Sequence, residues 1–115
     1  MTDIIYHLVP AEYWEARLLD RVYVPADFAR EGFIHCTRGD DQIALVANRH
    51  YRNDRRAWRV LVIDERAVIS EIKYEPGADD VLYPHIYGPL NREAVIEVLP
   101  MPRDPDGVFQ PLQRS

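Results

Sequence analysis

Cysteine and lysine are almost absent from this chain, whose 115 residues include one of each, Cys36 and Lys73. A single cysteine excludes an internal disulfide and is usual in a reducing compartment. Long apolar runs are lacking too, since no stretch approaches the roughly 18–20 residues that a membrane-spanning helix needs. The opening residues, MTDIIYHLV, lack the basic segment and the cleavage site of a signal peptide. These absences predict a cytoplasmic protein with no membrane segment.

Positive charge is scarce overall but concentrated in one place. The net charge of −5 disfavours a protein that coats nucleic acid. Residues 49–59 nevertheless hold five arginines against one aspartate, so this segment carries +4 and the rest of the chain −9. We interpret the segment as a solvated stretch after a helix. The alternative is a small phosphate-contacting patch, with Tyr51 and Trp58 as stacking surfaces.

The composition, 47% apolar and 29% charged, is typical of one folded domain. We expect a single domain over residues 1–115, with a core from about 3 to 99 and a proline-rich tail from 100 to 115. The patterns predict a strand at 3–9, a helix from 10 to about 20, a short strand and a helical turn within 21–31, the strand GFIHCT, a helix at 39–51, and strands at 59–64, 68–75 and 94–99. Two early helices followed by strands predict an α+β fold with a mixed, mostly antiparallel sheet.

Helical spacing predicts which residues of the two helices are buried. Pro10 suits the first position of the first helix, where Ala11, Trp14 and Leu18 share one face. The second helix presents Ile43, Val46, Ala47 and His50 on one face, so we expect His50 to be packed. The strand RVLVID is apolar at successive positions, which predicts that both of its faces are covered.

The stretch GFIHCTRGD places a histidine, the cysteine and a helix start side by side. Neighbours in a strand point to opposite faces, so we expect Cys36 to face the core and His35 to face a cleft. This arrangement excludes a Cys36 thiolate activated by His35. Thr37 followed by Asp40 resembles a capping box, so we expect Thr37 to cap the helix first and to contact a ligand second.

Three histidines and a glutamate are the remaining candidates for chemistry. His7, His35, His85 and Glu75 have side chains that suit zinc or iron, but none of their spacings is a recognised ligand pattern, so we predict no metal. Glu71 and Glu75 both alternate with apolar residues, as the solvated face of a sheet does. Glu75 stands at a strand end, where site residues are often presented, and this position favours it over Glu71.

Several motifs in order resemble one known family. The order YH, GFIHCT, an apolar strand ending in Asp, YE, PHIYGPL and DGVF resembles the bacterial domain-of-unknown-function family 952, over about residues 5–109. That family has no established activity but is grouped with the ADP-ribosyltransferase fold. The resemblance therefore implies an ADP-ribosyltransferase-like fold, with NAD as the cofactor that such a fold would bind.

The resemblance also implies roles for individual residues. His7, in the first strand, would hold a ribose of NAD, and His35, at the end of FIHCT, would line the nicotinamide subsite. Glu75, or otherwise Glu71, would stabilise the oxocarbenium-like charge of the transition state. The implied set is catalytic Glu75 and His35, with His7, Thr37, His85 and Tyr87 contacting the cofactor or the acceptor.

One departure from the transferase pattern favours one of the possible functions over the others. Leu8 and Val9 stand where transferases of this fold have Gly-Thr, and a leucine removes the close backbone approach that glycine permits. This favours a module that binds a nucleotide or NAD-like small ligand over an active ADP-ribosyl or phosphoryl transferase. A regulatory protein-interaction domain is the third interpretation. The sequence contains no signal from which an oligomeric state follows.

Overall fold

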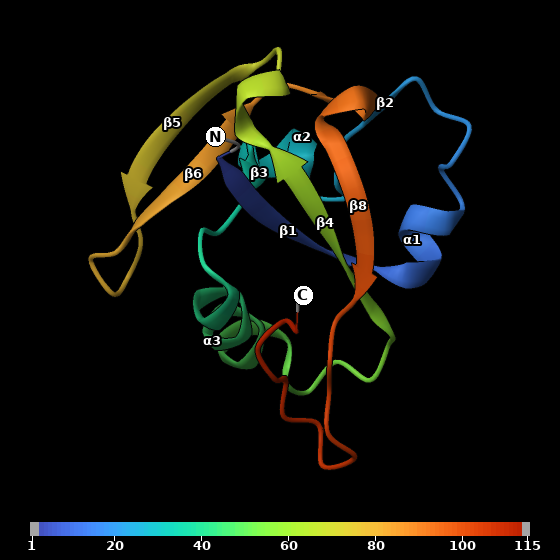
Figure 1. Cartoon of the computed structure of the whole chain (residues 1–115), viewed down its shortest axis with the longest axis vertical. Coiled ribbons are helices and arrows are strands. Elements are labelled where there is room, and N and C mark those ends of the chain that lie inside the picture. Colours follow the sequence, from blue (N-terminus) through green and yellow to red (C-terminus); the bar gives the residue numbers. More distant parts are fainter. Residues whose placement is uncertain (1–2, 114–115) are drawn as a thin grey trace.

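Residues 3–113 are described by a computed structural model, in which short helices pack with three small antiparallel sheets (Figure 1). In chain order the elements are β1 (Ile4–Pro10), α1 (Ala11–Glu15), β2 (Val22–Tyr23), α2 (Phe28–Glu31), β3 (Ile34–His35), α3 (Asp40–Tyr51), β4 (Trp58–Asp64), η1 (Glu65–Ala67), β5 (Glu71–Pro76), β6 (Leu82–Tyr87), β7 (Leu90–Asn91), η2 (Arg92–Ala94) and β8 (Val95–Pro100). Every strand pairing is antiparallel. The α+β prediction is confirmed.

The sheet β1-β4-β8 forms the centre of the molecule, with β4 as its middle strand. Four successive residues of β4, from 60 to 63, are fully buried, which confirms that this apolar strand is covered on both faces. On one face Ile5, Val9, Leu61 and Ile63 belong to a first apolar cluster. On the other face Tyr6, Leu8, Val60 and Val62 belong to a second cluster with helix α3.

The short segment after β3 joins two sheets. β3 pairs with β6, whose other neighbour is β5. The chain then continues alongside β1, where Tyr6 and Thr37 exchange both of their backbone hydrogen bonds at 2.8 Å. This exchange brings the end of β3 against β1, and it places the backbone of His35 beside the side chain of His7.

The first helix is shorter than predicted. Pro10 ends β1 and caps α1 instead of forming its first turn, and the helix stops at Glu15. Ala11 and Trp14 are buried as expected, but Leu18 is 56% exposed. The helix therefore has an apolar partner along only one turn, and the chain leaves the helical path where that partner ends.

The prediction that Thr37 caps the helix expected at 39–51, which is α3 in the structure, is wrong. The backbone of Thr37 belongs to the bridge with Tyr6, and α3 begins at Asp40 without any side-chain cap. Gly39 precedes it with a φ of 97°, a conformation that glycine adopts without strain. His50 is exposed, against the prediction that it packs, because the buried face of α3 is formed by Ile43, Ala44 and Ala47.

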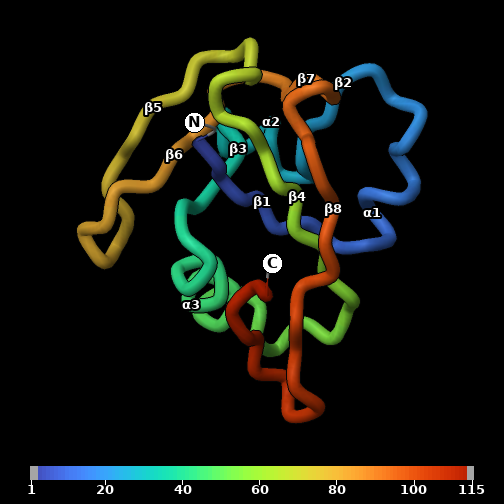
Figure 2. The backbone as a smooth tube through the Cα atoms, in the orientation of Figure 1, coloured from blue at the N-terminus to red at the C-terminus, as the bar shows by residue number. Residues whose placement is uncertain are grey.

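The C-terminal segment packs onto the central sheet. It was expected to lie outside a core ending near residue 99, but Met101, Phe109 and Leu112 are buried in the second apolar cluster. Figure 2 shows this segment, in red, folding back beside α3. The side-chain amide of Asn48 accepts from the N–H of Phe109 at 2.7 Å and donates to its carbonyl at 2.9 Å. No helix within residues 3–113 is long and apolar enough to cross a membrane.

Candidate functional site

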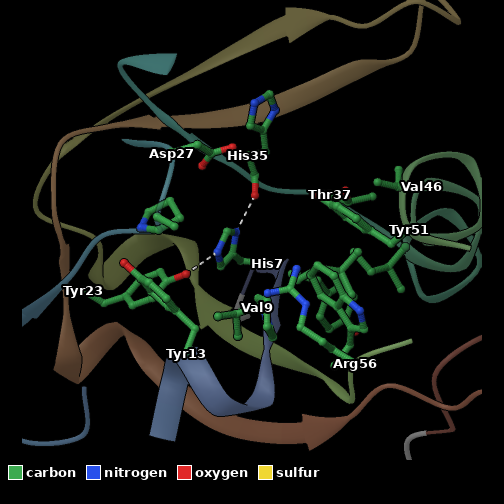
Figure 3. Close-up of a pocket in the computed structure, with 17 residues that line it drawn as sticks. His7, Val9, Tyr13, Tyr23, Asp27, His35, Thr37, Val46, Tyr51 and Arg56 are labelled. Atoms are coloured by element: carbon green, nitrogen blue, oxygen red, sulfur yellow. Dashed lines mark hydrogen bonds between the residues drawn. The ribbon is translucent and has the colours of Figure 1, made fainter. Parts of the chain in front are cut away.

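His7 is buried in the middle of β1 and uses both of its ring nitrogens within the protein. Nδ1 lies 2.7 Å from the carbonyl oxygen of His35, and Nε2 lies 2.8 Å from the hydroxyl of Tyr23 (Figure 3). A carbonyl only accepts, so Nδ1 carries the proton and Nε2 of the neutral ring accepts from Tyr23. Burial lowers the pKa of His7 to about 4, which keeps the ring neutral at physiological pH.

His35 and Cys36 point to opposite sides, as alternation along a strand predicts. The side chain of His35 is 57% exposed, whereas Cys36 is 2% exposed and belongs to the first apolar cluster. Burial raises the pKa of the Cys36 thiol, so it stays protonated and unreactive. Partial burial and the neighbouring His85 lower the pKa of His35, while Glu31, whose carboxylate lies 3.9 Å from Nε2, opposes this shift.

One face of the β3-β6-β5 sheet brings four of the predicted site residues together. His35 and His85 are cross-strand partners, and their rings lie 5.3 Å apart at 73°. The Glu75 carboxylate, diagonally across from His85 on β5, accepts from Nδ1 of His85 at 2.7 Å and from the Tyr87 hydroxyl at 2.5 Å. These two hydrogen bonds, that from Tyr87 first, lower the pKa of Glu75 and keep it ionised.

Phe33 belongs to the same face, although the sequence analysis did not single it out. Its ring stacks on that of His85, with centroids 4.1 Å apart and planes at 19°, and it also contacts the rings of His35 and Tyr87. Phe33 precedes His35 by two residues, so strand alternation was a signal that could have found it. The stacked ring and the Glu75 carboxylate together fix the orientation of His85.

The other predicted residues, His7 and Thr37, lie in a cavity on the far side of the His35 backbone. This inner cavity, of about 240 Å³, is lined by aromatic residues that include Tyr13, Tyr23, Tyr51 and Trp58. Figure 3 shows the His35 ring turned away from His7. Tyr51 and Arg56 lie on the side of His7 opposite to Tyr13 and Tyr23.

An outer cavity of about 570 Å³ adjoins the inner one and has a more polar wall. Its lining includes His35, His85, Arg30, Glu31, Arg49 and His50. Asp27, His35, Thr37, Val46 and Tyr51 line both cavities, which we call the cleft from here on. Arg49 is held at the rim by the Asp79 carboxylate at 3.1 Å. The cleft is therefore aromatic at one end and lined by guanidinium and imidazole groups at the other.

The structure separates the predicted residues into two groups. Glu75, His85 and Tyr87 form one network with His35 beside it, whereas His7 and Thr37 face the inner cavity. Over residues 3–113, no three side chains among His, Cys, Asp and Glu gather so that they could hold a metal ion. The alternative of a site built from all three strand histidines and Glu75 therefore has no support in the geometry.

The chain belongs to the family described as "Protein of unknown function (DUF952)", whose model matches residues 8–98. Among solved structures, it is similar to protein CC0527 from Caulobacter crescentus. The crystal structure of CC0527 has a TM-score of 0.80 at 24% identity and covers 93% of each chain. The solution NMR structure of CC0527 has a TM-score of 0.75 at 24% identity and covers 93% of this chain and 91% of that one. No curated protein matches the chain.

These comparisons confirm the predicted family and show which fold the chain shares. At 24% identity the likeness to CC0527 concerns the fold alone. The family description assigns no activity, so function has to be argued from the cleft itself.

Proposed function

We propose that this protein binds a nucleotide or NAD-like small molecule in the cleft. The observation that carries the proposal is that the two cavities adjoin and share lining residues, His35 and Thr37 among them, so that the cleft has chemically different ends. Small-molecule sites typically have roughly 300–1,000 Å³, a range that the two adjoining cavities together reach. The aromatic rings of the inner cavity suit a base, because every base offers a π face for stacking.

The outer cavity suits the phosphate groups of such a ligand. Arg30 and Arg49 line it, and each guanidinium has five N–H donors, of which the pairs with Asp27, Glu31 and Asp79 use only some. Guanidinium groups match phosphate oxygens in a bidentate manner. A ligand with a base in the inner cavity would therefore carry its phosphates past His35 toward Arg49.

The ADP-ribosyltransferase-like fold is part of this proposal, with one change of role. The resemblance implies that the histidines of the first strand and of FIHCT are neighbours, and His7 and His35 are joined by a hydrogen bond of 2.7 Å. Both ring nitrogens of His7 are engaged, so we assign the ribose contact to His35 and the hydroxyl of Thr37. NAD is then one ligand of the class, and nicotinamide release would identify an active transferase.

Calorimetric titration and thermal unfolding with AMP, ATP, ADP-ribose and NAD test the proposal. We expect saturable heat from at least one of them, and a ligand at about 100 times its Kd stabilises the folded state by about 2.7 kcal/mol. Arg49→Gln should weaken binding at least tenfold. Arg59→Gln, which also breaks an exposed ion pair but lies outside the cleft, is the matched control.

Absence of heat with all four compounds at millimolar concentration would refute the proposal. Equal binding by the wild type and both arginine variants would show that the ligand does not bind in the outer cavity. A protein that binds none of the compounds but is captured by a partner would favour the interaction domain instead.

A further inference from the structure

Two imidazole rings lie next to each other in the outer cavity and differ in their surroundings. His35 is half-exposed and close to Glu31, whereas the side chain of His85 is 11% exposed and fixed on two sides. Nδ1 of His85 donates to the ionised Glu75 carboxylate, so its Nε2 is the group left for a ligand. Within the described part of the chain, Nε2 of His85 has no hydrogen-bond partner.

This arrangement separates the two proton-transfer roles. The Glu75 carboxylate stabilises positive charge on the His85 ring and orients it, as a carboxylate does for an imidazole in many sites. His35 has no such partner at hydrogen-bond distance, and two adjacent imidazoles resist being charged at the same time. The carboxylate that orients His85 therefore suits this ring to the role of the acid, and His35, which lacks such a partner, is suited to the role of the base.

We propose that His85 and His35 act as the acid and the base that hydrolyse a phosphodiester bond of a nucleotide bound in the cleft. This inference rests on the proposed function, which supplies the ligand and places its phosphate between Arg49 and the two rings. Cys36 faces the core, so its thiol cannot attack, and the attacking group in this scheme is a water molecule.

The reaction balances with water as the only co-substrate. A ring nitrogen of His35 takes a proton from the water as its oxygen bonds to phosphorus. The bond from phosphorus to the leaving alcohol oxygen breaks, and Nε2 of His85 gives its proton to that oxygen. The products are a phosphomonoester and an alcohol, and the proton on His35 returns to His85 through solvent. Glu75 is a positioning residue in this scheme, because it acts through His85.

Two probe substrates with different leaving groups test the role of His85. 2′,3′-Cyclic AMP expels an alkoxide, which needs a proton, whereas bis(p-nitrophenyl) phosphate expels a stable phenolate, which does not. His85→Asn keeps an N–H that reaches Glu75 but removes Nε2. We expect this variant to lose roughly 10²–10⁴-fold in kcat on cyclic AMP, the usual contribution of general acid catalysis, and much less on the nitrophenyl ester.

Glu75→Gln should show the same selective loss, and Glu71→Gln, on the same strand outside the network, should show none. His35→Ala should slow both substrates alike, because the base is needed whatever the leaving group. The comparison of two substrates is made within each variant, so a lower folded fraction cancels out. If His85→Asn lowered kcat by a similar factor on both substrates, the proposal would be overturned.

The outcomes also separate this inference from the proposed function. Nucleotide binding by the wild type without hydrolysis of either probe would refute the acid–base pair and leave the binding site standing. Absence of both binding and hydrolysis would refute both. Hydrolysis that survives in His85→Asn and in His35→Ala would assign the activity to other groups and would refute the pair.

Discussion

Acidification from pH 7 to pH 5 should lower the free energy of unfolding by about 2 kcal/mol through His7 alone. The folded-state pKa of His7 is about 4, against 6.5 for an exposed histidine. Below pH 6.5 the unfolded chain therefore binds a proton that the folded chain refuses. The stabilisation is fully present above pH 6.5 and disappears as the pH falls toward 4, where the loss reaches about 3 kcal/mol.

The main structural reason is burial, because a charged His7 ring would be removed from water. Nδ1 already donates to the carbonyl of His35, and Nε2 accepts from Tyr23 in a buried site. Protonation would bury a charge without a carboxylate at hydrogen-bond distance, and the Tyr23 hydroxyl would have to change from donor to acceptor. Both costs are typical of buried polar groups that lose their partner.

Urea unfolding of the wild type and of His7→Asn between pH 5 and pH 7.5 measures this effect. The asparagine keeps an N–H for the His35 carbonyl but cannot titrate. Between pH 7.5 and pH 5 the free energy of unfolding of the variant should therefore fall by about 2 kcal/mol less than that of the wild type. Other groups titrate equally in both proteins and cancel in the difference. Parallel curves would refute the reasoning, as would a His7 ring resonance of the wild type that titrates near pH 6.5 in NMR spectra.

Three further predictions follow from buried groups. Tyr23→Phe should cost about 1–3 kcal/mol in urea unfolding, because it leaves the buried Nε2 acceptor of His7 without a donor; Tyr13→Phe, which removes a half-buried bond to a carbonyl, should cost less. Asn48→Ala should speed hydrogen exchange of the Phe109 amide, and unchanged exchange would show that the tail is held by other contacts. Cys36 should not react with a thiol reagent in the folded protein and should react fully in urea, since burial raises the pKa of its thiol.

Alternation along strands was the most dependable signal in the sequence. It predicted that Cys36 and His35 point to opposite faces and that RVLVID is buried on both sides, because a strand has only two faces. The family was also evident from short motifs such as FIHCT. Burial at the level of a whole strand therefore follows from local patterns.

Features that depend on distant parts of the chain did not follow from the sequence. Thr37 has the spacing of a cap, yet its backbone forms hydrogen bonds with that of Tyr6, a residue 31 positions earlier. Glu75 lies near the end of its strand, as Pro76-Gly77 indicates, but the direction of its side chain depends on the β5–β6 register, which sets it diagonally to His85. Leu18 fits the helical period, and only the absence of a packing partner explains its exposure.

The placement of the last strand and tail sets a limit on how early this chain can fold during translation. β1 is made before Phe109 and Leu112, which cover part of the face that carries Tyr6 and Leu8. Part of an apolar face of the central sheet therefore stays exposed until residues 109–112 have been made. A nascent chain arrested before residue 109 is expected to be a substrate for chaperones and proteases, even though the three histidines of the outer cavity, His35, His50 and His85, have already been made.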